Sequence, residues 1–139
     1  MDTQTQYTPG NTPLSKTSIW TGRFLSGFAI AFLLFDASLK LMKHPMAIEG
    51  TIALGYPVKT LFLMGVLLSI CLVVYVIPRT AILGAVLLTS YLGGAVATHI
   101  RVENPLFTHV LFPIYIAVFL WAGLGLRDPR VRTLLAPVR

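Results

Sequence analysis

The chain has 139 residues, of which 55% are apolar and only 12% are charged, and its mean hydropathy is +0.77. Soluble domains carry about 25% charged residues, so this composition excludes an ordinary water-soluble core and indicates an integral membrane protein. The net charge of +6 does not indicate a nucleic-acid partner, because lysine and arginine stand at the ends of apolar segments rather than in a basic stripe or motif.

The N-terminal third contains a tail, one apolar segment and a loop. Residues 1–17 are rich in Thr, Gln, Pro and Gly without a hydrophobic period, which predicts a disordered tail. An apolar segment follows at 19–42. Basic residues precede it as in a signal peptide, but Phe35-Asp36-Ala37 is not a small-residue cleavage site, so we expect a retained helix. Residues 44–59 are predicted as a loop, with a short interfacial helix over 46–54.

Three further apolar segments follow, at 60–77, 80–100 and 106–126. Each approaches the roughly 20 residues that cross a hydrocarbon layer about 30 Å thick. The last two connections are short, so the helices that they join should be antiparallel neighbours. The predicted fold is all-α, an integral-membrane antiparallel four-helix bundle over residues 18–127, followed by a basic tail over 128–139.

The cationic residues give the orientation, because cytoplasmic loops are enriched in lysine and arginine. One side of the predicted bundle carries seven of them, namely Lys16, Arg23, Arg79, Arg127, Arg130, Arg132 and Arg139. The other side carries four, namely Lys40, Lys43, Lys59 and Arg101. We therefore predict that both termini are cytoplasmic.

Several polar side chains fall at membrane depth, where a charge costs about 2.5–3.5 kcal/mol on insertion scales. Asp36 and Lys40 are four residues apart on one helical face, in the order that favours an ion pair. Alternatively, Lys40 extends to the interface and Asp36 follows it. Short connections bring further polar groups to the same surface. The candidate polar site, open to the extracytoplasmic face, comprises Asp36, Lys40, His44, His99, Arg101, Glu103 and His109.

Pro113 and two weaker candidates extend this picture. Pro113 lies inside the last apolar segment and should free the carbonyl of His109 beside the polar groups. Tyr91 is a weaker candidate on the third apolar segment. Arg23 lies near the opposite membrane surface, where an interface anchor is the simpler interpretation. We predict no metal site, because the histidines and carboxylates lack a metal-binding spacing.

The remaining features have structural interpretations. Small residues in the third apolar segment are interpreted as a packing face, with room for a ligand as the alternative; these are Gly84, Gly93, Gly94, Ala95 and Ala97. Aromatic residues near helix ends and faces are interpreted as interface anchors or filler; these are Trp20, Tyr75, Tyr91, Tyr115 and Trp121. The single cysteine, Cys71, excludes an intramolecular disulfide and is interpreted as a small buried hydrophobe.

Four short motifs occur in a distinctive order and spacing: Thr21-Gly22-Arg23, Lys40-Leu41, Leu54-Gly55-Tyr56-Pro57 and the segment 93–101. In this combination the chain resembles the DoxX-like family of small membrane proteins. The resemblance implies a four-helix architecture, a bacterial inner membrane, and motif positions at Arg23, Lys40, His99 and Arg101. The role of Asp36 depends on the charge argument alone.

Two functional hypotheses stay open. By family association, the chain is a redox-associated subunit that binds a quinone or another lipophilic molecule. His99 and the Asp36–Lys40 pair would then exchange protons with its head group, while the glycines and Tyr91 admit its ring. The electron donor would be a partner oxidoreductase, since no haem, flavin or iron–sulfur motif is present. The alternative is a non-catalytic scaffold or assembly factor for another membrane protein; a homo-oligomer is also open, and a transporter is a weaker third option.

Overall fold

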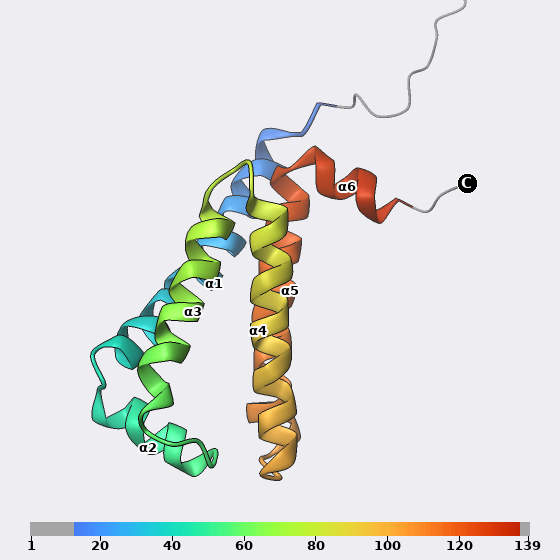
Figure 1. Cartoon of the computed structure of the whole chain (residues 1–139). Coiled ribbons are helices and arrows are strands. Elements are labelled where there is room, and N and C mark those ends of the chain that lie inside the picture. Colours follow the sequence, from blue (N-terminus) through green and yellow to red (C-terminus); the bar gives the residue numbers. More distant parts are fainter. Residues whose placement is uncertain (1–12, 137–139) are drawn as a thin grey trace, which may run out of the picture.

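A computed structural model describes residues 13–136, and the regular elements of this range are all helices (Figure 1). In chain order they are α1 (Lys16–Leu41), α2 (Pro45–Ala53), α3 (Thr60–Val76), α4 (Ala81–Arg101), the π-helix η1 (Leu106–Val110), α5 (Phe112–Arg127) and α6 (Pro129–Leu135). The predicted all-α class is confirmed.

Three helical segments are long and apolar enough to cross a membrane: Lys16–Leu41, Ala81–Arg101 and Leu106–Arg127, the last of which combines η1 and α5. Helix α3 is also apolar but has 17 residues. At 1.5 Å per residue it is roughly 25 Å long, the short end of the range for a spanning helix. Large apolar side chains are exposed on the outer faces of these helices, among them Phe24, Phe35, Leu63, Leu83 and Val118. Lipid is the solvent that suits such a surface.

The long helices contact one another in a closed circuit, because α1 packs on both α3 and α5, and α4 packs on the same two helices. Figure 1 shows the α1–α3 pair diverging from the α4–α5 pair toward the end that carries α2. Small and branched apolar side chains form the core between them, including Ala29, Leu33, Leu68, Leu72, Leu88, Leu92, Ile116 and Leu120.

Glycines allow close approach at two helix crossings. A Cβ on Gly84 of α4 would lie 2.3 Å from the Cα and N atoms of Tyr75 on α3. A Cβ on Gly22 of α1 would lie 2.7 Å from the carbonyl oxygen of Gly123 on α5. Gly93 and Gly94 differ, since a Cβ on either would meet nothing within 4 Å and both are exposed. The predicted packing role therefore applies to Gly84 and is wrong for Gly93 and Gly94 within this chain.

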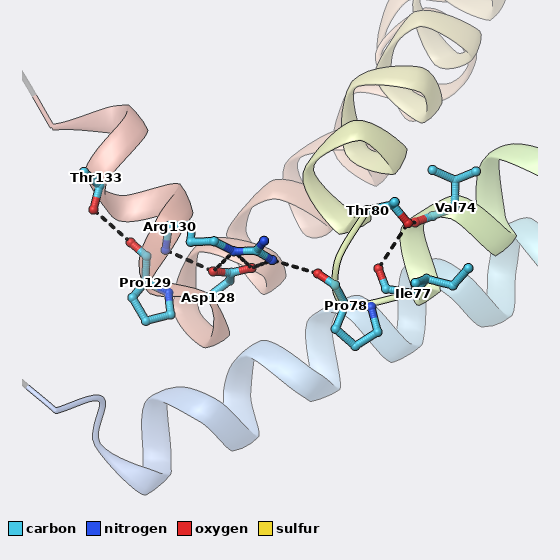
Figure 2. Close-up of polar contacts among 8 residues, drawn as sticks. All are labelled: Val74, Ile77, Pro78, Thr80, Asp128, Pro129, Arg130 and Thr133. Atoms are coloured by element: carbon cyan, nitrogen blue, oxygen red, sulfur yellow. Dashed lines mark hydrogen bonds and ion pairs between the residues drawn. The ribbon is translucent and has the colours of Figure 1, made fainter.

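The α3–α4 turn and the start of α6 meet at one end of the molecule (Figure 2). Arg130 donates to the Asp128 carboxylate at 2.8 Å and to the carbonyl of Pro78 at 2.7 Å. Asp128 also caps α6 by accepting from the backbone N–H of Arg130 at 3.0 Å. The hydrogen bond from the Arg130 side chain holds the pKa of this carboxyl below its usual range. The Asp128 cap is therefore ionised at neutral pH and holds Arg130, which in turn joins α6 to the turn between α3 and α4.

Three local features differ from the sequence-based expectations. Helix α1 begins at Lys16, inside the segment predicted as a tail; residues 1–12 and 137–139 lie outside the described residues. Helix α6 occupies part of the predicted basic tail, where Asp128 and Pro129 supply an N-cap and a proline in the first turn. The last apolar segment forms the π-helix η1 followed by α5, and Pro113 stands in the first turn of α5. It still lies inside the membrane-length helical segment Leu106–Arg127 that η1 and α5 form together.

Candidate functional site

An ion pair joins Asp36 and Lys40, one turn apart in the last two turns of α1. The side chains are 35% and 17% exposed, respectively. Helix α3 covers the stem of Lys40, because a Cβ on Gly65 would lie 3.0 Å from the Lys40 Cβ atom. Lys40 also stands in the last turn of its helix, where a cation is favoured by the helix dipole. The pair is therefore held between α1 and α3 rather than extended away from the protein.

Tyr91 of α4 is half-buried, and its ring packs against the core. No described residue forms a hydrogen bond with the Tyr91 hydroxyl. Lys40 uses one of its three N–H donors on Asp36. The structure thus brings Asp36 and Lys40 together, and hydrogen-bond donors remain on Lys40 and on Tyr91.

Arg101 is directed elsewhere, toward the loop between α2 and α3. Its guanidinium donates to the carbonyl of Leu54 and lies 5.7 Å from the centroid of the Tyr56 ring. Gly55 adopts a φ of +79°, a conformation that favours glycine, and a Cβ there would lie 3.3 Å from Nη2 of Arg101. Tyr56 and Thr98 are joined by a 2.9 Å hydrogen bond, in which Tyr56 is the donor because Thr98 donates to the carbonyl of Gly94. We call these contacts the α2–α4 latch.

The latch explains two of the sequence motifs in physical terms. Leu54-Gly55-Tyr56 supplies the carbonyl, the turn and the aromatic ring, while the end of the 93–101 segment supplies Thr98 and Arg101. Arg101 was predicted as a site residue. Its contacts give it a structural role, which is to hold the connection between α2 and α3 against the end of α4.

His99 and His109 form a second, separate contact. Their ring centroids are 5.7 Å apart and the planes cross at 63°. The π-helix η1 carries His109 to this position, directly after the turn that ends α4. Asn104 Nδ2 lies 2.8 Å from Nδ1 of His99, and since an amide nitrogen donates, Nδ1 accepts and the neutral ring carries its proton on Nε2. His109 Nδ1 bonds the hydroxyl of Thr108 at 2.8 Å.

Other predicted residues stand apart from these contacts. Glu103 is exposed, has a φ of +55°, and forms no ion pair with any residue of the described range. His44 caps α2 by accepting from the backbone N–H of Met46 at 3.2 Å. Arg23 is exposed near the opposite end of α1, 5.5 Å from the ring centroid of Trp20. Within residues 13–136, no three His, Cys, Asp or Glu side chains lie close enough together to hold a metal.

One buried polar chain was not anticipated from the sequence. Tyr75 of α3 is fully buried and donates to the carbonyl of Leu120 on α5 at 2.9 Å. Ser26 of α1 therefore donates to the Tyr75 oxygen at 3.0 Å, and Ser26 in turn accepts from Nε of Arg127 at 3.3 Å. These four residues tie α1, α3 and α5 together. The Tyr75 phenol is the sequence signal for this chain, because a buried tyrosine hydroxyl usually has a hydrogen-bond partner. The partner could not be predicted, because Tyr75 stands in an apolar segment with no polar neighbour in sequence.

The polar side chains are of two kinds: some have all their hydrogen bonds within the protein, and others keep donors that a ligand could use. The latch and the Ser26–Tyr75–Arg127 chain satisfy their groups internally, and no buried side-chain nitrogen or oxygen within the described part of the chain lacks a partner. Lys40 in its pair with Asp36, and Tyr91 on α4, retain hydrogen-bond donors. A carbonyl or another acceptor on a lipophilic molecule would match those donors.

Comparison with known proteins supports the family resemblance. The model of the DoxX-like family matches residues 24–123, which contain α1 from Phe24 onward, the latch, the histidine pair and most of α5. Searches of curated proteins and of solved structures found no match. The family match covers well over half of the chain, includes Lys40, His99 and Arg101, and agrees with the membrane-length helices. This chain belongs to the DoxX-like family.

Proposed function

We propose that this DoxX-like membrane protein is an antiparallel four-helix bundle of the bacterial inner membrane that binds a quinone or another lipophilic molecule. In this proposal α1, α3, α4 and the η1–α5 segment all cross the bilayer, and both termini are cytoplasmic. Six cationic residues of the predicted cytoplasmic set belong to the described range. Contacts between Ser18 and Leu126 and between Arg130 and Pro78 support their location at one end.

The observation that carries the proposal is the Asp36–Lys40 ion pair held between α1 and α3. An ion pair in a low-dielectric region adds little net stability compared with apolar residues of similar volume. Its presence at membrane depth is therefore better explained by a ligand than by stability. Lys40 and Tyr91 would donate to a carbonyl oxygen of the ligand, and Asp36 would keep Lys40 in place.

The proposal assigns the supply of protons to the histidine pair. His99 and His109 lie at the α2-bearing end, which faces the extracytoplasmic side in the proposed orientation, and a neutral imidazole has one nitrogen that donates a proton and one that accepts it. Reduction of a bound quinone to a quinol requires two electrons and two protons. The protons would enter from this surface, and a partner oxidoreductase would supply the electrons.

The scaffold hypothesis has its own support. Much of the polar structure is internally satisfied, as the α2–α4 latch and the Ser26–Tyr75–Arg127 chain show. Such contacts fix how helices pack without requiring a ligand. A non-catalytic assembly factor for a partner membrane protein, or a homo-oligomer, would use the outer faces of the same helices.

Tyr91→Phe tests the ligand proposal against the scaffold. Purified protein in mild detergent is titrated with a short-chain benzoquinone in a calorimeter, and an organic extract of the unliganded protein is analysed for native quinone. Loss of one donated hydrogen bond should weaken binding about tenfold. Tyr115→Phe is the matched control, because it removes an exposed phenol from α5, and it should leave the affinity unchanged. Absence of binding by the unmodified protein, or equal affinities for both variants, would favour the scaffold.

A further inference from the structure

A groove of about 640 Å³ lies where α6 leaves the end of α5, at the opposite end of the molecule from the candidate site. Figure 1 shows α6 projecting sideways from α5 instead of continuing along its axis. One wall is made by Val118, Trp121 and Ala122 of α5, and the other by Leu135 and Arg132 of α6. The angle between the two helices therefore creates the groove.

Helix α6 is firmly attached in this position. Val131, a residue of α6 itself, is fully buried. Arg132 donates from Nε to the carbonyl of Gly125 at 3.0 Å and from Nη2 to the hydroxyl of Ser18 at 3.0 Å. Together with the bond from Arg130 to Pro78, these contacts connect α6 to α1, α5 and the α3–α4 turn. The groove is a consequence of the fold and not of a loosely placed terminal helix.

The walls of the groove are hydrocarbon. Val118 is 58% exposed and Leu135 is 70% exposed, while the Trp121 indole is held in place by donating to Thr89 at 2.8 Å. From Val118 to Leu126 the groove runs along nine residues of α5, roughly 12 Å, which is a little less than half of the hydrocarbon thickness of about 30 Å. An acyl chain within one leaflet fits this length and chemistry.

The mouth of the groove carries a positive charge. Within residues 13–136 the ion pairs are Asp36–Lys40 and Asp128–Arg130, so Asp128 offsets Arg130 but no carboxylate of this range lies within 4.0 Å of the Arg132 guanidinium. Arg132 is positioned by neutral acceptors only. A guanidinium fixed in this way keeps its full charge and further N–H donors, which suit a phosphate group.

We propose that this groove binds one anionic phospholipid from the leaflet next to α6. The acyl chain lies against Val118, Trp121 and Ala122, and the phosphate accepts from Arg132. Charge complementarity and the hydrocarbon walls together select this occupant, because basic pockets beside transmembrane helices recognise anionic head groups. The site is independent of the proposed quinone site, since the two use different residues at opposite ends of the helices.

Native mass spectrometry of the detergent-purified full chain tests the head-group contact. Dioleoylphosphatidylglycerol and dioleoylphosphatidylcholine are titrated separately. We expect a single phosphatidylglycerol to bind at least about fivefold more tightly than phosphatidylcholine, which corresponds to the contribution of one basic residue at an anionic surface. Arg132→Gln should remove this preference and Arg132→Lys should restore part of it. The control is Arg79→Gln, which removes an exposed cation from the α3–α4 turn at the same end. Equal affinity of the unmodified protein for the two lipids would overturn the proposal.

Ala122→Phe tests the acyl-chain wall without disturbing the contacts of Arg132. It should lower phosphatidylglycerol affinity by about fivefold or more, because the added ring occupies the groove that the chain would fill. Ala31→Phe places the same ring on an exposed position of α1 and should have no effect. An unchanged affinity in Ala122→Phe would contradict the proposal. So would conversion of a dimer to a monomer by this variant at constant lipid affinity, since the groove would then be a contact between two copies of the chain.

Discussion

Gly84→Ala is expected to lower the free energy of unfolding by about 3 kcal/mol, the upper part of the range for an overpacked interior. The added Cβ would lie 2.3 Å from the backbone atoms of Tyr75, and a backbone cannot move aside as a flexible side chain can. Helices α3 and α4 would have to separate. That separation would also disturb Tyr75, whose hydroxyl joins α1 and α5 to α3.

The matched control is Gly93→Ala, nine residues further along the same helix. Its Cβ would meet nothing within 4 Å, so the substitution should be neutral or stabilise by up to about 1 kcal/mol through helix propensity. Stability is measured by titrating the detergent-solubilised protein with a denaturing detergent and by thermal melting. Similar stabilities for the two variants would mean that α3 and α4 do not cross at Gly84.

Asp36→Asn is expected to destabilise the protein by about 3 kcal/mol, the lower end of the range for breaking a buried ion pair. The lower end applies because the Asp36 side chain is about a third exposed. The loss arises mainly from Lys40, which would keep its charge beside α3 without a partner. Lys40→Met should cost a similar amount by leaving the carboxylate alone.

The double variant Asp36→Asn/Lys40→Met separates pairing from other causes. Removal of both charges leaves no isolated ion, so the double variant should be considerably more stable than the sum of the single losses predicts. A thermal double-mutant cycle on the purified protein measures this difference. If the single losses simply add, the two groups do not interact, and the contact between them has no energetic role.

Much of the fold follows from local sequence patterns, and particular elements show why. Four apolar segments bounded by prolines, glycines and cations predict helices close to those of α1, α3, α4 and α5. The spacing of Asp36 and Lys40 is enough to predict their contact, since residues four apart in a helix are neighbours. Helix α6 also has a local signal, since Asp128 followed by Pro129 is typical of a helix N-terminus, although the basic composition of residues 128–139 alone indicates only a charged tail.

Contacts between distant segments were harder to predict. Arg101 and His99 are two residues apart, yet Arg101 bonds the α2–α3 loop while His99 contacts His109. The expected depth in the membrane predicts only that all these residues lie near one surface. Which neighbour each side chain meets depends on the rotation of its helix about its own axis, and depth gives no information about that rotation. The same limit applies to the glycines, since only the position of α3 distinguishes Gly84 from Gly93.

The central claim is that all four apolar helices cross the membrane and that the candidate polar site faces outward. Cysteine labelling tests it most directly, because the chain has a single cysteine and Cys71→Ser gives a cysteine-free background. Single cysteines are introduced at exposed positions: Gly50 and Glu103 at the α2-bearing end, and Arg79 and Thr133 at the other. Intact cells are then treated with a membrane-impermeant maleimide.

Gly50→Cys and Glu103→Cys should be labelled in intact cells, whereas Arg79→Cys and Thr133→Cys should react only after the membrane is permeabilised. The Arg79→Cys variant is the most informative about the number of membrane spans, because Arg79 follows α3, the 17-residue helix whose length is at the short end for a membrane span. If Arg79→Cys and Gly50→Cys were both labelled in intact cells, α3 would not cross the membrane. If Thr133→Cys were labelled in intact cells, the C-terminal end would lie outside. Either result would contradict the four-helix membrane arrangement.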